Sequence, residues 1–203
     1  MKLYVTPGSP YARIARMMIF EKGLESRVEV IVAQTRQADS PYYRINPSGR
    51  VPYLLRGDGV GLEESTVICG YLDHLDGNPT FDLPEGNQGW EVRRLGALAR
   101  STLDGLAVWL REVARPPNER SPTVIAHEAS RSQRLADVWE LEIAHPWMSG
   151  SLNLEQVTLV CVLGLETRIP DFYWRAGHPN LSGWFERIAA RPAYAATAPD
   201  ASL

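Results

Sequence analysis

Three short stretches of the sequence place hydroxyl, acidic or proline residues where a helix or a strand is expected to begin. The first is Gly8-Ser9-Pro10-Tyr11, in which Ser9 comes directly before an apolar helical pattern. A hydroxyl at that point lies beside the unpaired N–H groups and the positive end of the helix dipole, which stabilise an anion such as a phosphate, a carboxylate or a thiolate. Ser is also a favoured helix-capping residue, so a purely structural cap is the alternative.

The second stretch contains Val51-Pro52 at the beginning of an expected strand. A proline cannot donate a hydrogen bond within a sheet, so the pair indicates a special backbone geometry. A cis peptide bond would fit, although cis is the minority form of X-Pro bonds. It would leave the N–H and C=O of Val51 available to pair with an extended peptide ligand. An edge strand with a trans proline is the alternative.

The third stretch, Glu63-Glu64-Ser65-Thr66, places an acid and a hydroxyl at the start of another expected helix. Ser65 can cap that helix while a free N–H binds a carboxylate. An acid and an anion-binding cap side by side suit a zwitterion, with its ammonium against Glu64 and its carboxylate against Ser65. Helix capping alone would also account for this stretch.

The elements that would position these stretches form an α/β unit with a mixed sheet. Apolar residues after Pro10 recur at the three-and-four spacing of a helix with one buried face, and Gly23 would end that helix. Short apolar runs predict the strands, and Gly57-Asp58-Gly59 predicts a turn between the last two. The expected order is strand 2–6, helix 10–23, strand 28–32, a polar connection at 38–49, strand 51–55, strand 60–63 and helix 65–75.

Composition changes at Asp76–Gly89, a stretch rich in Gly, Pro, Asp and Asn that predicts a linker. No convincing strand follows it. Helical spacing continues for about six turns until Pro116-Pro117 ends the pattern. Further helices are expected at about 123–144, from about Asn153, where Asn is a favoured cap, and at about 179–190. The second half therefore predicts a helical bundle.

The overall composition excludes several classes of partner. The 203 residues carry a formal net charge of −3 with scattered basic residues, which gives no general attraction to nucleic acid. No stretch approaches the roughly 18 apolar residues of a membrane span, and the N-terminus lacks the features of a signal peptide, so a cytoplasmic location is expected. Cys69 and Cys161 are far apart without partner residues, which argues for small core residues and against a metal site.

Taken together, the stretches resemble the glutathione S-transferase family, of the kind with serine at the first helix. The resemblance lies in SPYAR at the first helix, NPSGRVPYL at the third strand, LEESTVICGYLD at the next helix and HPNLSGWFERIAARPAYAAT near the end. It covers essentially the whole chain. It implies a thioredoxin-like glutathione-binding domain at 1–77, an all-helical domain at 87–203 and a homodimer.

The resemblance also implies roles for individual residues toward glutathione, which would be a co-substrate. The backbone of Val51 would pair with the cysteinyl part, and Glu64 with Ser65 would hold the γ-glutamyl end. Arg50 would meet the glycine carboxylate. Ser9 would face the sulfur and activate the thiol by hydrogen bonding, since relatives with Cys at this place form mixed disulfides and act as reductases.

A hydroxyl that donates to a thiolate lowers the pKa of the thiol, and one or two units below about 8.5 would ionise much of it at neutral pH. Tyr4, on the first strand, is the competing hydroxyl because some classes of the family use a tyrosine there. Activation without any hydroxyl is the third option.

The expected activity is glutathione transfer to a small hydrophobic electrophile. Tyr11, Trp109, Leu110 and Val113 are candidates for lining the electrophile pocket, although most of the apolar residues on the long helix must hold the bundle together. Two alternatives stay open, namely a non-catalytic glutathione-binding stress or partner protein and a glutathione-dependent isomerase.

Overall fold

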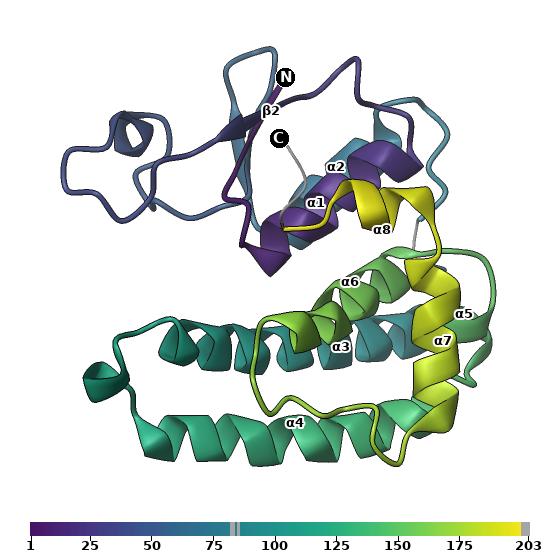
Figure 1. The fold of residues 1–203 in the computed structure, drawn as a ribbon. Helices are drawn as coiled ribbons and strands as arrows, with labels where there is room; N and C mark the ends of the chain where they lie inside the picture. The colour runs from purple at the N-terminus through teal and green to yellow at the C-terminus, as the bar shows by residue number, and fades with distance from the viewer. Residues whose placement is uncertain (82–83, 85, 200–203) are drawn as a thin grey trace. The chain divides into compact units, whose positions relative to one another are not determined.

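The chain divides into two compact units, which are described separately. A computed structural model describes residues 1–81, 84 and 86–199 (Figure 1). The first unit comprises Met1–Asp82 together with Pro192–Leu203, and the second comprises Leu83–Arg191. The predicted boundary between an α/β part and a helical part therefore falls inside the stretch expected to be a linker.

A four-stranded mixed sheet forms the centre of the first unit. Its strands are β1 (Lys2–Val5), β2 (Glu29–Val32), β3 (Tyr53–Leu55) and β4 (Gly61–Glu63), in the order β2-β1-β3-β4. β1 runs parallel to β2 and antiparallel to β3, and β3 runs antiparallel to β4. The prediction of an α/β unit with a mixed sheet is confirmed.

Helices α1 (Pro10–Glu21) and α2 (Ser65–His74) pack against each other, and α2 also contacts β3 and β4. Both ends of α1 follow from local sequence. Ser9 caps its start, and at its end the N–H of Gly23, which has a φ of 61°, donates to the carbonyl of Phe20. This is the arrangement in which glycine commonly ends a helix, because glycine adopts positive φ without a steric penalty.

The short helix α8 (Pro192–Ala196) contacts α1 and so belongs to the first unit. This differs from the predicted helical domain over 87–203, which included the C-terminal residues. The reason is a set of long-range contacts that local periodicity does not encode.

Those contacts come from two buried arginines of α1. Arg13 donates to the carbonyl of Tyr194 at 2.9 Å, and its guanidinium carbon lies 4.0 Å from the centre of the Tyr194 ring. Arg16 donates to the carbonyls of Ala196 and Thr197 at 3.3 and 3.4 Å. The guanidinium groups thus donate to carbonyls at and just after the end of α8, where a helix leaves its last carbonyls available.

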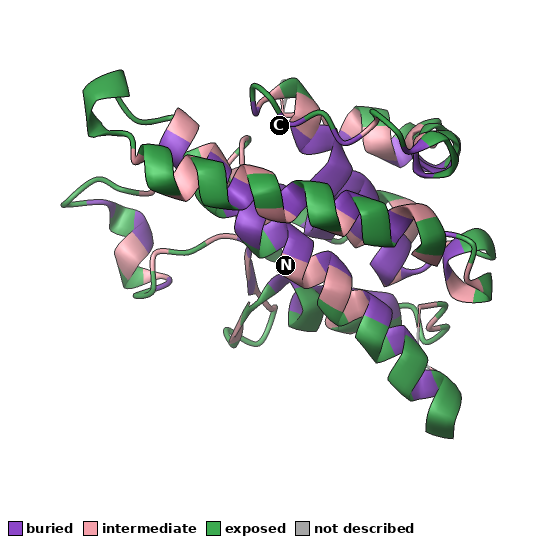
Figure 2. Cartoon of the chain, turned by 90° about the horizontal axis from the view of Figure 1, so that it is seen from below, coloured by how far each residue is buried: buried purple, intermediate pink, exposed green. Residues whose placement is uncertain are grey.

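In its described residues the second unit is all helical, as predicted. Its helices are α3 (Gly86–Val113), α4 (Pro122–Glu142), α5 (Pro146–Ser149), α6 (Leu154–Leu163) and α7 (Pro179–Ala189). Helix α3 packs against α4 and α6, and α7 packs against α4 and α6 (Figure 1). In Figure 2 the long helices carry buried residues along one side and exposed residues along the other, the pattern of amphipathic helices around a shared core.

Short 3-10 turns occur at Pro41–Arg44 in the first unit and at Pro117–Glu119 and Gly164–Thr167 in the second. The side chains of Cys69 and Cys161 are both buried, which confirms their prediction as core residues. Among the described residues, no helix combines the length and the apolar character needed to cross a membrane.

Candidate functional site

The sheet brings the three stretches that suggested chemistry to one edge. β1 and β3 are antiparallel with Tyr4 opposite Tyr53, so the end of β1 that leads to Ser9 lies beside the beginning of β3 at Pro52. β3 and β4 are antiparallel with Tyr53 opposite Glu63, so the end of β4 reaches the same edge. Three segments that are distant in sequence therefore meet in the first unit.

Ser9 lies at the N-terminus of α1 with its side chain half-buried. Its Oγ accepts a hydrogen bond from the N–H of Ala12 at 3.2 Å, so the predicted N-cap is confirmed. No acceptor for the Ser9 hydroxyl hydrogen lies within the described part of the chain. The hydroxyl can therefore donate to an anion placed at the helix N-terminus, where the helix dipole also favours negative charge.

The Val51–Pro52 peptide bond is cis, which confirms the geometry proposed from the sequence. Val51 is half-buried and lies just before β3. Within the described residues, its backbone N–H and C=O have no hydrogen-bond partner, so both are free to pair with an extended ligand. Arg50, the preceding residue, is exposed and carries the positive charge nearest to this backbone in sequence.

At the third stretch the structure corrects one detail of the prediction. Glu64, not Ser65, is the N-cap of α2, and its Oε2 accepts from the N–H of Thr66 at 3.0 Å. Ser65 is the first helical residue, is buried and donates from its Oγ to Oε1 of Glu64 at 3.3 Å. The cap shifts by one residue because Glu64 adopts a φ of 73°, which aims its carboxylate back at the first turn.

A positive φ is uncommon for a glutamate and costs on the order of 1–3 kcal/mol, so a strained residue of this kind is a sign of a functional site. The Glu64 carboxylate remains exposed beside the helix N-terminus. An acid and a hydroxyl thus lie together at the end of β4, as the sequence predicted.

Tyr4 lies in a different environment from Ser9. Its side chain is buried, and its ring packs against Tyr42 and Tyr53 with centroid distances of 5.5 and 6.4 Å. The same burial raises the pKa of Tyr42 to about 12. This aromatic cluster packs under the sheet edge, and it gives Tyr4 a structural role that is independent of any ligand.

The four residues predicted for the electrophile pocket are divided between the two units. Tyr11 lies in the first turn of α1 and is half-buried. Trp109, Leu110 and Val113 lie on α3 in the second unit, where Leu110 and Val113 are half-buried. Trp109 is buried with an edge-to-face contact to Phe172 at 6.1 Å, so its indole contributes to the core of the bundle.

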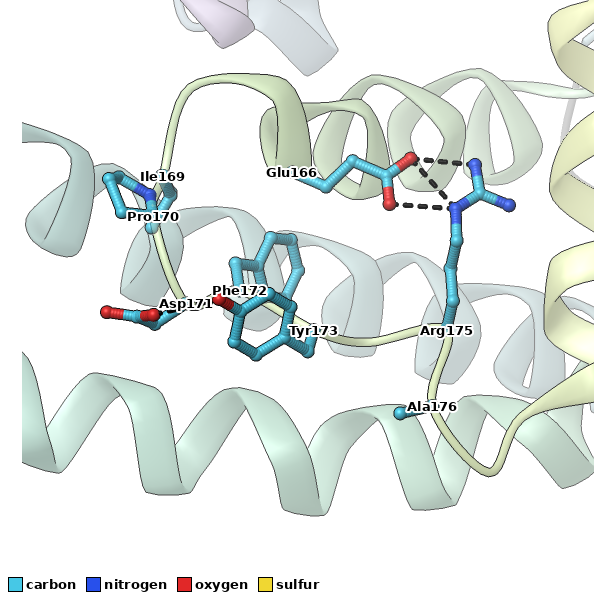
Figure 3. Close-up of a pocket in the computed structure, with 8 residues that line it drawn as sticks. All are labelled: Glu166, Ile169, Pro170, Asp171, Phe172, Tyr173, Arg175 and Ala176. Carbon is cyan, nitrogen blue, oxygen red and sulfur yellow. Dashed lines mark hydrogen bonds and ion pairs between the residues drawn. The ribbon is translucent and has the colours of Figure 1, made fainter.

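A cavity of about 440 Å³ lies within the second unit and is lined by the segment that follows α6 (Figure 3). Its charged groups are engaged with one another, since Arg175 binds Glu166 at 2.7 Å and Tyr173 donates to Asp171 at 3.0 Å. It contains none of the predicted site residues. The lining residues are Glu166, Ile169, Pro170, Asp171, Phe172, Tyr173, Arg175 and Ala176.

Sequence reasoning missed the side chains that hold the loop before Val51. Asn46, Ser48 and Glu63 all stand inside the stretches singled out above, but no role was assigned to them. In the structure the carboxylate of Glu63 accepts from the side chains of both Asn46 and Ser48. No local spacing could have revealed a bond across 17 residues.

Comparisons with known proteins agree with this architecture. The family model described as the N-terminal domain of glutathione S-transferase matches residues 8–75. Over 98% of both chains, the structure resembles a glutathione transferase family member of Pseudomonas fluorescens Pf-5 with bound glutathione, with a TM-score of 0.85 and 32% identity. The same relative with bound S-(propanoic acid)-glutathione gives a TM-score of 0.84.

In Escherichia coli K12, the GST-like protein YibF, described as uncharacterized, is 27% identical over 98% of both chains. The matched features include the sheet edge described above, because residues 8–75 contain Ser9, the cis-proline loop and the start of α2. The similarity to the Pseudomonas protein extends through the helical unit to nearly the full chain. This protein therefore belongs to the glutathione S-transferase family.

Proposed function

We propose that this protein is a glutathione transferase that binds glutathione at the sheet edge of the first unit and activates its thiol with Ser9. The observation that carries the proposal is the meeting of three binding elements at that edge. They are the Ser9 hydroxyl at a helix N-terminus, the unpaired backbone of Val51, and the Glu64–Ser65 pair.

These elements complement the chemistry of the tripeptide. An extended cysteinyl unit pairs with the N–H and C=O of Val51 as a strand pairs with a sheet edge. The γ-glutamyl ammonium lies against the exposed carboxylate of Glu64, and its carboxylate lies at the N-terminus of α2 beside Ser65. Arg50 offers its guanidinium to the glycine carboxylate at the far end.

Ser9 acts on the sulfur. The thiol proton leaves to solvent, and the hydroxyl of Ser9 donates to the thiolate that remains. Oγ accepts from the N–H of Ala12, and its own hydrogen is available to donate to a ligand. The thiolate then attacks an electrophilic carbon, forming a carbon–sulfur bond by addition or with departure of a leaving group.

The ligands bound to the Pseudomonas fluorescens relative support this proposal. That protein was obtained with glutathione and with a glutathione whose sulfur bears a propanoic acid group. A site that accepts both has room beyond the sulfur. We propose that the corresponding space here takes a small electrophile with apolar character, and that Tyr11 in the first turn of α1 contributes to recognising it.

The test combines binding with turnover. Calorimetry with glutathione should show saturable uptake at millimolar concentration or below, and a panel of electrophiles should reveal consumption of free thiol. Uptake without turnover across the panel would indicate a non-catalytic glutathione-binding protein. A product with the same molecular formula as its substrate, formed without net consumption of glutathione, would indicate an isomerase. Absence of uptake by folded protein would refute the proposal.

A further inference from the structure

We propose that Glu63 is a positioning residue that joins the two halves of the proposed glutathione site. Glu63 is the last residue of β4 and directly precedes Glu64, which belongs to the half that would bind the γ-glutamyl end. Its side chain contacts the loop that carries Arg50 and Val51, which would bind the rest of the tripeptide. The inference rests on the proposed function.

The first step is the contact itself. Oε1 of Glu63 accepts from Nδ2 of Asn46 at 2.7 Å and from the hydroxyl of Ser48. Hydrogen bonds to an ionised acceptor are about twice as strong as neutral ones. A single carboxylate oxygen thus holds two side chains of the loop before β3.

The second step is the transmission of that contact to Arg50. Nδ2 of Asn46 also donates to the carbonyl of Arg50 at 3.0 Å, and the N–H of Arg50 donates to Oγ of Ser48 at 3.2 Å. Asn46 is buried, and its Oδ1 accepts from the N–H of Ser48 at 3.1 Å. Both backbone polar groups of Arg50 are therefore held by the two side chains that Glu63 holds, and the Tyr42 hydroxyl also donates to the Arg50 carbonyl.

The third step is an account of the donors. The Asn46 amide has two hydrogens and three acceptors within reach, which are Glu63 at 2.7 Å, the Arg50 carbonyl at 3.0 Å and the Tyr42 hydroxyl oxygen at 3.3 Å. Without the carboxylate, the Asn46 amide loses its shortest hydrogen bond and the hydroxyl of Ser48 loses its acceptor. Asn46 and Ser48 would then rearrange, and the Arg50–Val51 backbone would be held less firmly, with the Tyr42 hydroxyl still donating to the Arg50 carbonyl.

Glu63 does not need to touch glutathione for this role. Its effect is to set the spacing between the unpaired backbone of Val51 and the carboxylate of Glu64, which must match the length of the tripeptide. A ligand that contacts both halves loses affinity when one half is mobile, because binding must then also order that half.

The variants are Glu63→Ala, which removes the acceptor, and Glu63→Gln, which keeps a neutral acceptor oxygen. Glu29→Ala is the matched control, because Glu29 is an exposed glutamate of β2 whose side chain has no hydrogen-bond partner in the described chain. In calorimetry we expect Glu63→Ala to weaken the Kd for glutathione about tenfold, as 1.4 kcal/mol would. Glu63→Gln should restore most of this loss, and Glu29→Ala should match the wild type.

Amide hydrogen exchange without ligand provides a second readout. The N–H groups of Ser48 and Arg50 should exchange faster in Glu63→Ala than in the wild type or in Glu29→Ala, while those of β1 stay unchanged. Equal exchange rates in Glu63→Ala and the wild type would overturn the positioning role.

The two proposals fail in different ways. Wild-type protein that takes up no glutathione would refute the proposed function and, with it, the ligand part of this inference. Wild-type protein that binds glutathione, together with an Ala variant of equal Kd, would refute the role of Glu63 alone. A Glu63→Gln variant that binds glutathione as weakly as Glu63→Ala would also overturn it, because the hydrogen bonds accepted by a neutral oxygen would then add nothing to the affinity.

Discussion

The change Ser9→Ala removes two interactions that the structure allows us to separate. One is the N-cap, in which Oγ accepts from the N–H of Ala12 at 3.2 Å. Loss of such a cap costs about 1 kcal/mol of stability, which lowers Tm by about 2–4 °C in a chain of this size. The other is the donor that we propose for the glutathione thiolate.

The second loss sets the size of the catalytic effect. A hydrogen bond to a charged group contributes about 1.5–3 kcal/mol, so its removal should raise the pKa of the bound thiol by about one to two units. At neutral pH the fraction of thiolate, and with it kcat/KM, should fall by about eight- to twenty-five-fold, because a thiol one to two units below about 8.5 is already partly to mostly ionised. Glutathione affinity should change little, because Val51, Glu64 and Ser65 still hold the tripeptide.

The assay is a pH titration of thiolate absorbance in protein saturated with glutathione, alongside kinetics at neutral pH. Ser121→Ala is the matched control, since Ser121 caps α4 in the same way and accepts from the N–H of Val124 at 3.3 Å. It should lose a similar amount of stability with no change in the bound thiol. If the thiol titrates identically in Ser9→Ala and in the wild type, the hydroxyl does not activate it.

Three further outcomes are expected. Burial raises the pKa of the Glu155 carboxyl, so the folded state binds this proton more tightly than the unfolded state does. The free energy of unfolding should therefore fall as the pH rises through the unfolded value near 4.5. Urea melts should show Glu155→Gln gaining stability relative to the wild type over that rise. Deleting Pro192–Leu203 should destabilise the protein by about 3 kcal/mol or more in urea, because Arg13 and Arg16 lose their carbonyl partners, and an unchanged midpoint would contradict this. The resemblance to the family predicts sedimentation at twice the chain mass of 22.7 kDa, and a monomer at micromolar concentration would be evidence against it.

Local features of the site could be predicted because they depend on neighbouring residues. Ser9 and Pro10 specify a helix start whatever packs around them, and the structure confirms the cap. Asn153 behaves in the same way, with its Oδ1 accepting from the N–H of Gln156. The geometry of Val51–Pro52 could be proposed from a proline at the beginning of a strand.

The cap of α2 shows where local reasoning becomes ambiguous. Glu64 and Ser65 are both able to cap a helix, so residue type alone does not choose between them. The choice follows from the backbone, since a φ of 73° at Glu64 places its carboxylate over the N–H of Thr66. That torsion is set where β4 leaves the sheet, and it is therefore a property of the folded unit.

By itself, the sequence determined the class of the fold, the starts of helices such as α1 and α6 and the chemistry of the proposed ligand contacts, because periodicity, capping and residue type act over a few residues. Only the tertiary structure decided that Glu63 holds Asn46 across 17 residues and that Arg13 binds Tyr194 across 181. Such contacts depend on where the chain returns in space, and no pattern within a single helix or strand specifies that.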